Sequence, residues 1–130
     1  KTAQERADDA LKFYELGFRA IKIRFHHENP TDDLALAATV KKAVGEKMDV
    51  MVDANQAGKR KGDLPPVWDY DRALMMAREL DAMGVYWLEE PLNRTAYDDL
   101  GRIRRQVKHL HLAGGEGNVG LDRFSHSLVM

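Results

Sequence analysis

Two hydrophobic patterns alternate along this chain, one with helical spacing and one as short apolar runs. The first stretch with helical spacing ends at Gly17, and an apolar run over 20–25 follows it. The apolar positions of that first stretch are Ala7, Ala10, Leu11 and Tyr14. The pattern predicts an amphipathic helix followed by a short strand.

The same order of helix, glycine and strand then repeats. A second helix is predicted to open at 30–33, with Thr31 as its N-cap, and to end at Gly45. The apolar, partly β-branched run 50–52 predicts the second strand, which leads into Asp53.

A polar loop over 58–66 separates the second unit from the third. The third helix carries apolar residues from Tyr70 to Leu80, closes at Gly84 and precedes a strand at 85–88. The longer spacing between the second and third units is explained by this loop.

The fourth unit begins with a helix near Thr95, where Asp98 resembles the second residue of a capping box. Its strand, 109–113, runs into Gly114-Gly115-Glu116. Helices and strands in alternation predict an α/β fold with a parallel sheet and right-handed crossovers. A doubly wound sheet and a (β/α)8 TIM-type barrel both fit this pattern. Four strands make half of such a barrel, which typically takes about 250 residues.

Composition and charge narrow the class of protein. The chain has 130 residues, and 20 Lys and Arg against 21 Asp and Glu leave a net charge of −1. We expect no nucleic-acid partner, since there is no basic excess, and no membrane span, since no apolar run approaches roughly 18–20 residues. The lack of cysteine excludes thiolate chemistry and is compatible with a reducing compartment, so we expect a cytoplasmic protein. The missing initiator Met suggests a part of a longer protein.

Charged residues gather towards the C-terminal end of each predicted strand. The first strand carries Lys22 and Arg24, which lie two residues apart and so share one face. The other three strands lead into acidic residues, which are Asp53, Glu89 with Glu90, and Glu116. Because parallel strands bring their C-terminal ends to one edge, where α/β proteins bind and react, we expect these side chains to meet there.

Three of these acids, Asp53, Glu89 and Glu116, predict a metal site. Clustered carboxylates repel one another and protonate unless a cation is present. An all-oxygen ligand set suits Mg²⁺ or Mn²⁺ and leaves room for water or substrate. Lys22 and Arg24 would add positive charge without ligating. Metal and cations together suit a substrate carboxylate and the dianion that forms when a proton leaves the neighbouring carbon.

Each of these residues also has a plainer interpretation. An acid after a strand is often the N-cap of the next helix or a solvated loop residue. Lys22 and Arg24 could belong to a half-exposed edge strand, and Glu90 should point away from Glu89 as a supporting or loop residue. The repetition of acids at one position in successive units favours the metal site.

Two neighbouring histidines follow the first predicted strand. His26 and His27 could each act as a general acid or base, because an imidazole titrates near neutral pH. A plain loop histidine is the commoner situation, so neither is assigned to the site.

Three short motifs stand in order on successive predicted strands. They are Val52-Asp53-Ala54-Asn55-Gln56, Trp87-Leu88-Glu89-Glu90-Pro91-Leu92 and Gly114-Gly115-Glu116, with Lys22-Ile23-Arg24 before them. This set resembles the enolase superfamily, specifically its mandelate racemase/muconate lactonizing enzyme branch. The resemblance covers nearly the whole chain. It implies that residues 1–130 are part of the C-terminal (β/α)8 catalytic barrel domain, without the N-terminal capping domain and the later strands.

The resemblance also implies roles for individual residues. Asp53, Glu89 and Glu116 match the three Mg²⁺ ligands of the family, Lys22 matches a lysine that helps hold the substrate carboxylate, and Asn55 matches a polar residue beside metal and substrate. The family reaction begins with removal of the proton α to a carboxylate, which gives an enediolate. Racemisation, epimerisation, cycloisomerisation or loss of water follows. We expect a small carboxylate substrate and a homo-oligomeric full-length protein.

Arg24 departs from the family pattern, because it stands where the family has a catalytic lysine. A guanidinium holds its proton too tightly to be a good general base, so we expect Arg24 to steady an anion. This favours a one-way reaction with its base elsewhere, such as dehydration of a sugar acid or another α-hydroxy acid. A racemase, epimerase or cycloisomerase is one alternative, and a non-catalytic metal-binding or assembly homologue is another.

Overall fold

The computed structural model describes residues 1–64 and 67–128 and contains the four predicted helices and four predicted strands in the predicted order, followed by one helix, α5 (Leu121–Leu128), that was not predicted. The helices are α1 (Ala3–Glu15), α2 (Pro30–Val44), α3 (Tyr70–Met83), α4 (Tyr97–Arg104) and α5 (Leu121–Leu128). The strands are β1 (Ala20–Arg24), β2 (Asp49–Asp53), β3 (Trp87–Glu89) and β4 (His111–Ala113). The polar loop predicted over 58–66 is described as far as Leu64.

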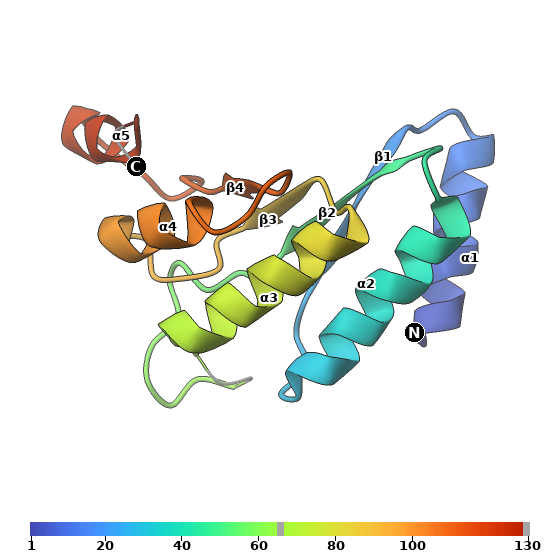
Figure 1. Ribbon diagram of the computed structural model, residues 1–130, viewed down its shortest axis with the longest axis horizontal. Helices are drawn as coiled ribbons and strands as arrows, with labels where there is room; N and C mark the ends of the chain where they lie inside the picture. The colour runs from blue at the N-terminus through green and yellow to red at the C-terminus, as the bar shows by residue number, and fades with distance from the viewer. Residues whose placement is uncertain (65–66, 129–130) are drawn as a thin grey trace.

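The four strands are parallel and lie in the order β1-β2-β3-β4. Each strand therefore pairs with its predecessor in the chain, and the order does not reverse. A doubly wound sheet needs such a reversal to place helices on both faces, whereas a (β/α)8 barrel adds each strand on the same side of the last. Figure 1 shows α2 and α3 side by side over the sheet, with α1 beside α2. The structure thus decides for the barrel-type arrangement.

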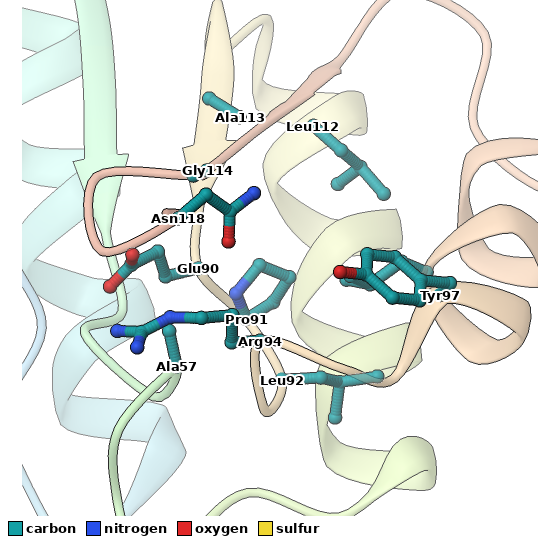
Figure 2. A pocket seen from close by; sticks show the side chains of 12 residues that line it. Ala57, Glu90, Pro91, Leu92, Arg94, Tyr97, Leu112, Ala113, Gly114 and Asn118 are labelled. Carbon is teal, nitrogen blue, oxygen red and sulfur yellow. The ribbon is translucent and has the colours of Figure 1, made fainter. Parts of the chain in front are cut away.

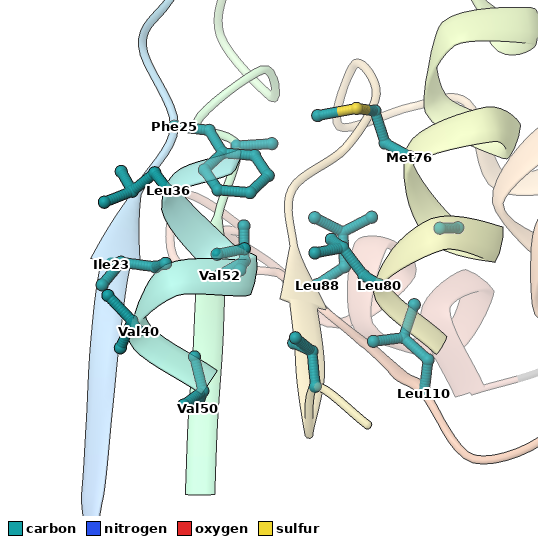
Figure 3. Packing of buried hydrophobic residues seen from close by; sticks show 14 of the residues in the cluster. Ile23, Phe25, Leu36, Val40, Val50, Val52, Met76, Leu80, Leu88 and Leu110 are labelled. Carbon is teal, nitrogen blue, oxygen red and sulfur yellow. The ribbon is translucent and has the colours of Figure 1, made fainter. Parts of the chain in front are cut away.

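The hydrophobic core lies between the helices and one face of the sheet. Ile23, Val52 and Leu88 come from three neighbouring strands and are 4%, 0% and 0% exposed. They pack against residues of α2 and α3, among them Val40 and Leu80 (Figure 3). Burial of these side chains fixes which face of each strand turns inwards, because neighbouring residues of a strand point to opposite faces.

Two predicted helix starts are wrong in detail. The N-cap of α2 is Asn29, whose side-chain oxygen accepts the backbone N–H of Thr31 at 3.0 Å, so Thr31 lies inside the helix. The helix α4 begins after Ala96 without a side-chain cap. Thr95 instead donates hydrogen bonds from its backbone N–H and its hydroxyl to Asn93 Oδ1. Thr95 therefore belongs to the turn before the helix. In both places a nearby asparagine offers the better-placed acceptor.

No helix among the described residues is both long and apolar enough to span a membrane.

Candidate active site

The register of the sheet places the predicted site residues in one row. Arg24 pairs with Asp53, Asp53 pairs with Glu89, and Glu89 pairs with Ala113 of β4. We call Arg24, Asp53 and Glu89 the polar row. These residues lie on the face opposite the hydrophobic core, since the residues before them in each strand are the buried ones. Lys22 precedes Arg24 by two residues and shares this face.

Ion pairs connect the two cations to the two acids. Lys22 Nζ donates to Glu89 Oε2 at 2.7 Å and lies 3.9 Å from Asp53 Oδ2. Arg24 Nη2 lies 3.3 Å from the same Asp53 oxygen. The acid side chains are 6% and 13% exposed, for Asp53 and Glu89 respectively, whereas Lys22 is 42% and Arg24 65% exposed. The cations therefore cover the carboxylates from the solvent side. The hydrogen bond to Glu89 raises the pKa of the Lys22 ammonium, which keeps it charged.

The backbone bends sharply just after both acids. Asn55 has φ 51° and Glu90 has φ 49°, and they are the non-glycine residues with positive φ in the described part of the chain. Asn tolerates this left-handed conformation, but for Glu it is uncommon and costs of order 1 kcal/mol. The Asn55 backbone N–H also donates to Asp53 Oδ1 at 2.9 Å. The turn after β2 therefore holds the Asp53 carboxylate in place through the backbone of Asn55.

The third predicted ligand, Glu116, lies on an exposed turn after β4. Its charge still reaches the site, as the pKa of Glu90 shows. Burial raises the pKa of Glu90 most, and the charges of Asp53, Glu116 and Glu89 raise it further, while Arg94 lowers it. Four carboxyl groups therefore share one electrostatic neighbourhood, which is the condition that a bound cation relieves.

The carboxylates of the three predicted metal ligands do not converge on a common point. Among the described residues, the group of His, Asp and Glu side chains whose ligand atoms all lie within 4.8 Å of one another is His26, His27 and Asp33. Asp53 and Glu89 instead share the Lys22 ammonium. An oxygen-only donor set that already gathers positive charge fits a hard divalent cation such as Mg²⁺. The ligand role of Asp53, Glu89 and Glu116 stays a prediction.

A cavity of about 290 Å³ opens beside the polar row, between the loops that follow β3 and β4. Figure 2 shows Glu90, Arg94, Tyr97 and Asn118 around it, together with apolar side chains from β4 and the β3–α4 loop. Arg94 had no role in the sequence-based prediction, because an isolated polar residue in a loop carries no spacing signal, and Tyr97 was predicted only as an apolar residue of the fourth helix.

Gln56 is a further residue whose role the sequence did not reveal. It is 2% exposed, and its side chain donates to Ala54 O and accepts from the backbone N–H of Trp68, both at 2.9 Å. Its own backbone N–H donates to Glu90 O at 2.9 Å. Gln56 thus connects the turn after β2, the residues just before α3 and the turn after β3. Its place in the Asp-Ala-Asn-Gln motif was the available signal.

These features define a parallel α/β domain of the (β/α) barrel type with a carboxylate-rich site at the C-terminal edge of its strands. The chain belongs to the family described as enolase C-terminal domain-like, whose model matches residues 5–129.

Two curated relatives show what this chain is similar to. An arabinonate dehydratase of Saccharolobus solfataricus is 27% identical over 116 residues, which cover 89% of this chain and 28% of that protein. A 3,6-anhydro-alpha-L-galactonate cycloisomerase of Streptomyces coelicolor is 34% identical over 110 residues, which cover 82% of this chain and 27% of that protein. Both relatives are enzymes, and the chain spans less than a third of the length of each.

Solved structures agree with the fold. A protein assigned as a mandelate racemase from Bordetella bronchiseptica RB50 superimposes with a TM-score of 0.86 at 29% identity, covering 99% of this chain and 32% of that one. A racemase from Streptomyces coelicolor A3(2) with bound magnesium gives a TM-score of 0.80 at 28% identity, covering 98% of this chain and 32% of that one.

Proposed function

We propose that this chain supplies the metal-binding half of an active site that removes the proton α to a carboxylate, and that the reaction is dehydration of a sugar acid or another α-hydroxy acid. The observation that carries the proposal is the polar row, in which Arg24, Asp53 and Glu89 stand in register with Lys22 beside them. The dehydratase and the magnesium-bound racemase among the relatives support it.

Mg²⁺, with Mn²⁺ as a second candidate, would be held by Asp53, Glu89 and Glu116, and it supplies Lewis-acid stabilisation of negative charge. A cation there would release Lys22 from Glu89. The freed ammonium is then placed to bind a substrate carboxylate, because it stands in the row next to the polar row.

Arg24 has the chemistry of an anion binder. Its side chain is 65% exposed at the edge of the site, and a guanidinium is a planar cation that recognises carboxylates. It can therefore steady the negative charge that develops on the substrate, but it cannot take the α proton. The general base must come from another residue. Asn55 is exposed at the turn after β2, where its side-chain amide can meet the substrate.

The test is a panel of aldonates and aldarates supplied with Mg²⁺ to the full protein that contains this chain. Dehydration removes the α proton and the β hydroxide, which leave as water, and yields a 2-keto-3-deoxy acid that absorbs after reaction with semicarbazide. We expect this product from at least one sugar acid, and we expect EDTA to abolish it. Absence of turnover over the whole panel, with Mg²⁺ still tightly bound, would support a non-catalytic homologue.

A second candidate reaction is cycloisomerisation or racemisation, favoured by the identity to the cycloisomerase. Running the panel in D2O separates the reactions. A racemase or epimerase returns substrate that carries deuterium at the α carbon, and a cycloisomerase gives an isomer of the substrate that has lost no water, although it can carry deuterium from the solvent. A dehydratase releases water. Deuterated substrate without a keto acid would contradict the proposed dehydration.

A further inference from the structure

A second group of potential metal ligands lies outside the polar row, in the loop between β1 and α2 and the first turn of α2. It consists of His26, His27 and Asp33, and we call it the histidine cluster. One ligand atom from each residue lies within 4.8 Å of the others. The two imidazole rings lie against each other, with their centroids 4.3 Å apart and an angle of 30° between their planes. None of these residues takes part in the proposed reaction.

Asp33 is the buried residue of the histidine cluster. It is 1% exposed, and its Oδ1 accepts from His27 Nδ1 at 2.7 Å and from the backbone N–H groups of His26 and His27 at 3.2 and 3.3 Å. Its other oxygen, Oδ2, is buried and has no hydrogen-bond partner in the described structure. A buried carboxylate oxygen without a partner is costly, so it needs an explanation such as an ion.

The loop that carries the histidines is held from a second side. Arg72 of α3 donates from Nη1 to Glu28 O at 3.0 Å and from Nη2 to His27 O at 3.2 Å. Asp33 fixes the same loop from α2. The backbone of the two histidines is therefore already positioned by two helices, and a ligand would need little further ordering of the chain.

The charge balance indicates which cation would bind. The Arg72 guanidinium attracts Asp33 electrostatically and so offsets part of its negative charge. A hard cation such as Mg²⁺, which depends on anionic oxygens, would gain little here. Two imidazoles and one carboxylate suit a cation that prefers nitrogen ligands, such as Zn²⁺ or Co²⁺. Ligands of a tetrahedral Zn²⁺ stand roughly 3.3 Å apart, so His27 Nδ1 and Asp33 Oδ1, now 2.7 Å apart, would separate by roughly half an ångström on binding.

We infer that His26, His27 and Asp33 form a second cation site, separate from the polar row and selective for an imidazole-preferring divalent cation of the Zn²⁺ type. On binding, the ring proton between His27 and Asp33 leaves to solvent, and the ion takes its place. The site joins the end of β1 to the start of α2. It stands independently of the proposed reaction, because none of its ligands belongs to the polar row, which it meets only where His26 Nδ1 lies 3.3 Å from the backbone oxygen of Arg24.

The experiment is a Zn²⁺ titration of the full protein by calorimetry, with Mg²⁺ in large excess so that oxygen-only sites are occupied. Co²⁺ serves as the spectroscopic probe, since its visible absorption reports nitrogen ligands. The test variants are His26→Asn and His27→Asn. An asparagine at 27 can still donate a hydrogen bond to Asp33, which guards the fold. The matched control is His109→Asn, because that imidazole is exposed and lies outside the histidine cluster.

We expect the unaltered protein and His109→Asn to bind Zn²⁺ equally, and each cluster variant to bind it at least tenfold more weakly and to lose the Co²⁺ band. Asp33→Asn should do the same, and circular dichroism will show whether it stays folded. If it unfolds, the two histidine variants decide. Unchanged Zn²⁺ affinity in both histidine variants would overturn the inference. So would displacement of the bound zinc by Mg²⁺, which would place the zinc in the polar row.

Discussion

The two faces of the sheet have opposite character, although the same strands build both. On the helix-covered face, Ile23, Val52 and Leu88 stand next to one another and are almost fully buried. On the other face, one residue further along each strand, the register aligns Arg24, Asp53 and Glu89. Burial is thus continuous across one face, and charge is continuous across the end of the other.

This difference shows that the residues on one face of a strand stabilise the fold, whereas the alternating residues on its other face form the candidate site. The apolar face holds the strands in register by packing against α2 and α3. The polar row inherits that register, which brings its acids together, and the ion pairs with Lys22 and Arg24 offset the repulsion between them. The following predictions test this division, from the largest expected effect to the smallest.

Asp53→Asn should nearly abolish activity and leave the fold intact. The change removes a predicted metal ligand and an acid that two cations share, so we expect a loss of at least about 10²-fold in kcat/KM and weaker Mg²⁺ binding. Asp49→Asn is the matched control, since Asp49 begins the same strand and is exposed. Equal loss in both variants, or an unchanged Mg²⁺ titration in Asp53→Asn, would remove Asp53 from the site.

Leu88→Ala, in contrast, should strongly lower the stability of the fold. Leu88 is 0% exposed on the apolar face, and such truncations lower the free energy of unfolding by about 2–5 kcal/mol. Urea denaturation of the full protein measures it. Met51→Ala, on the half-buried opposite face, serves as the control and should cost less. If Met51→Ala were the more damaging change, the assignment of the two faces would be reversed.

Asp81→Asn should give a smaller and pH-dependent loss of stability. Burial opposes the charge of Asp81, but three backbone N–H groups, of residues 108 to 110, donate to its carboxylate and bring its pKa below the ordinary 3.8. The charged form therefore stabilises the fold above about pH 4, and this contribution is lost as the pH falls through the lowered pKa.

At neutral pH we expect a loss of about 1 kcal/mol for Asp81→Asn, because the group is only half-buried. The measurement is the urea midpoint of both proteins between neutral and acidic pH. Their difference should shrink below about pH 4. Glu79→Gln on the same helix is the control, and a difference that stays constant with pH would contradict the role of the charge.

Gly117→Ala should have the smallest effect. A Cβ at this position would overlap the guanidinium of Arg94, which is the flexible end of a long side chain and can move aside. We expect stability to change by no more than about 0.5 kcal/mol. Gly58→Ala is the control, because nothing lies near its Cβ position. A thermal shift assay compares the two, and a clearly larger loss at Gly117 would mean that Arg94 is rigidly held.

The sequence determined the order of helices and strands, the apolar face and the acids at the strand ends. Hydrophobic spacing is a local property that each segment carries by itself, and Gly17, Gly45 and Gly84 marked where helices end. The ordered motifs around Asp53, Glu89 and Glu116 likewise indicated the family that the whole-chain comparison shows.

Only the tertiary structure decided between a doubly wound sheet and a barrel. The order of the strands depends on which strands pair, and the sequence of a single strand does not specify its partner. The tertiary structure also decided that Asn29 rather than Thr31 caps α2, since the helix begins at Pro30 and the Asn29 side chain accepts the backbone N–H of Thr31. The joining of Lys22 to Glu89, 67 residues apart, and the burial of Asp33 beneath two histidines depend on the packing of separate elements. Such contacts arise when helices and strands meet in space, so spacing along the chain cannot reveal them.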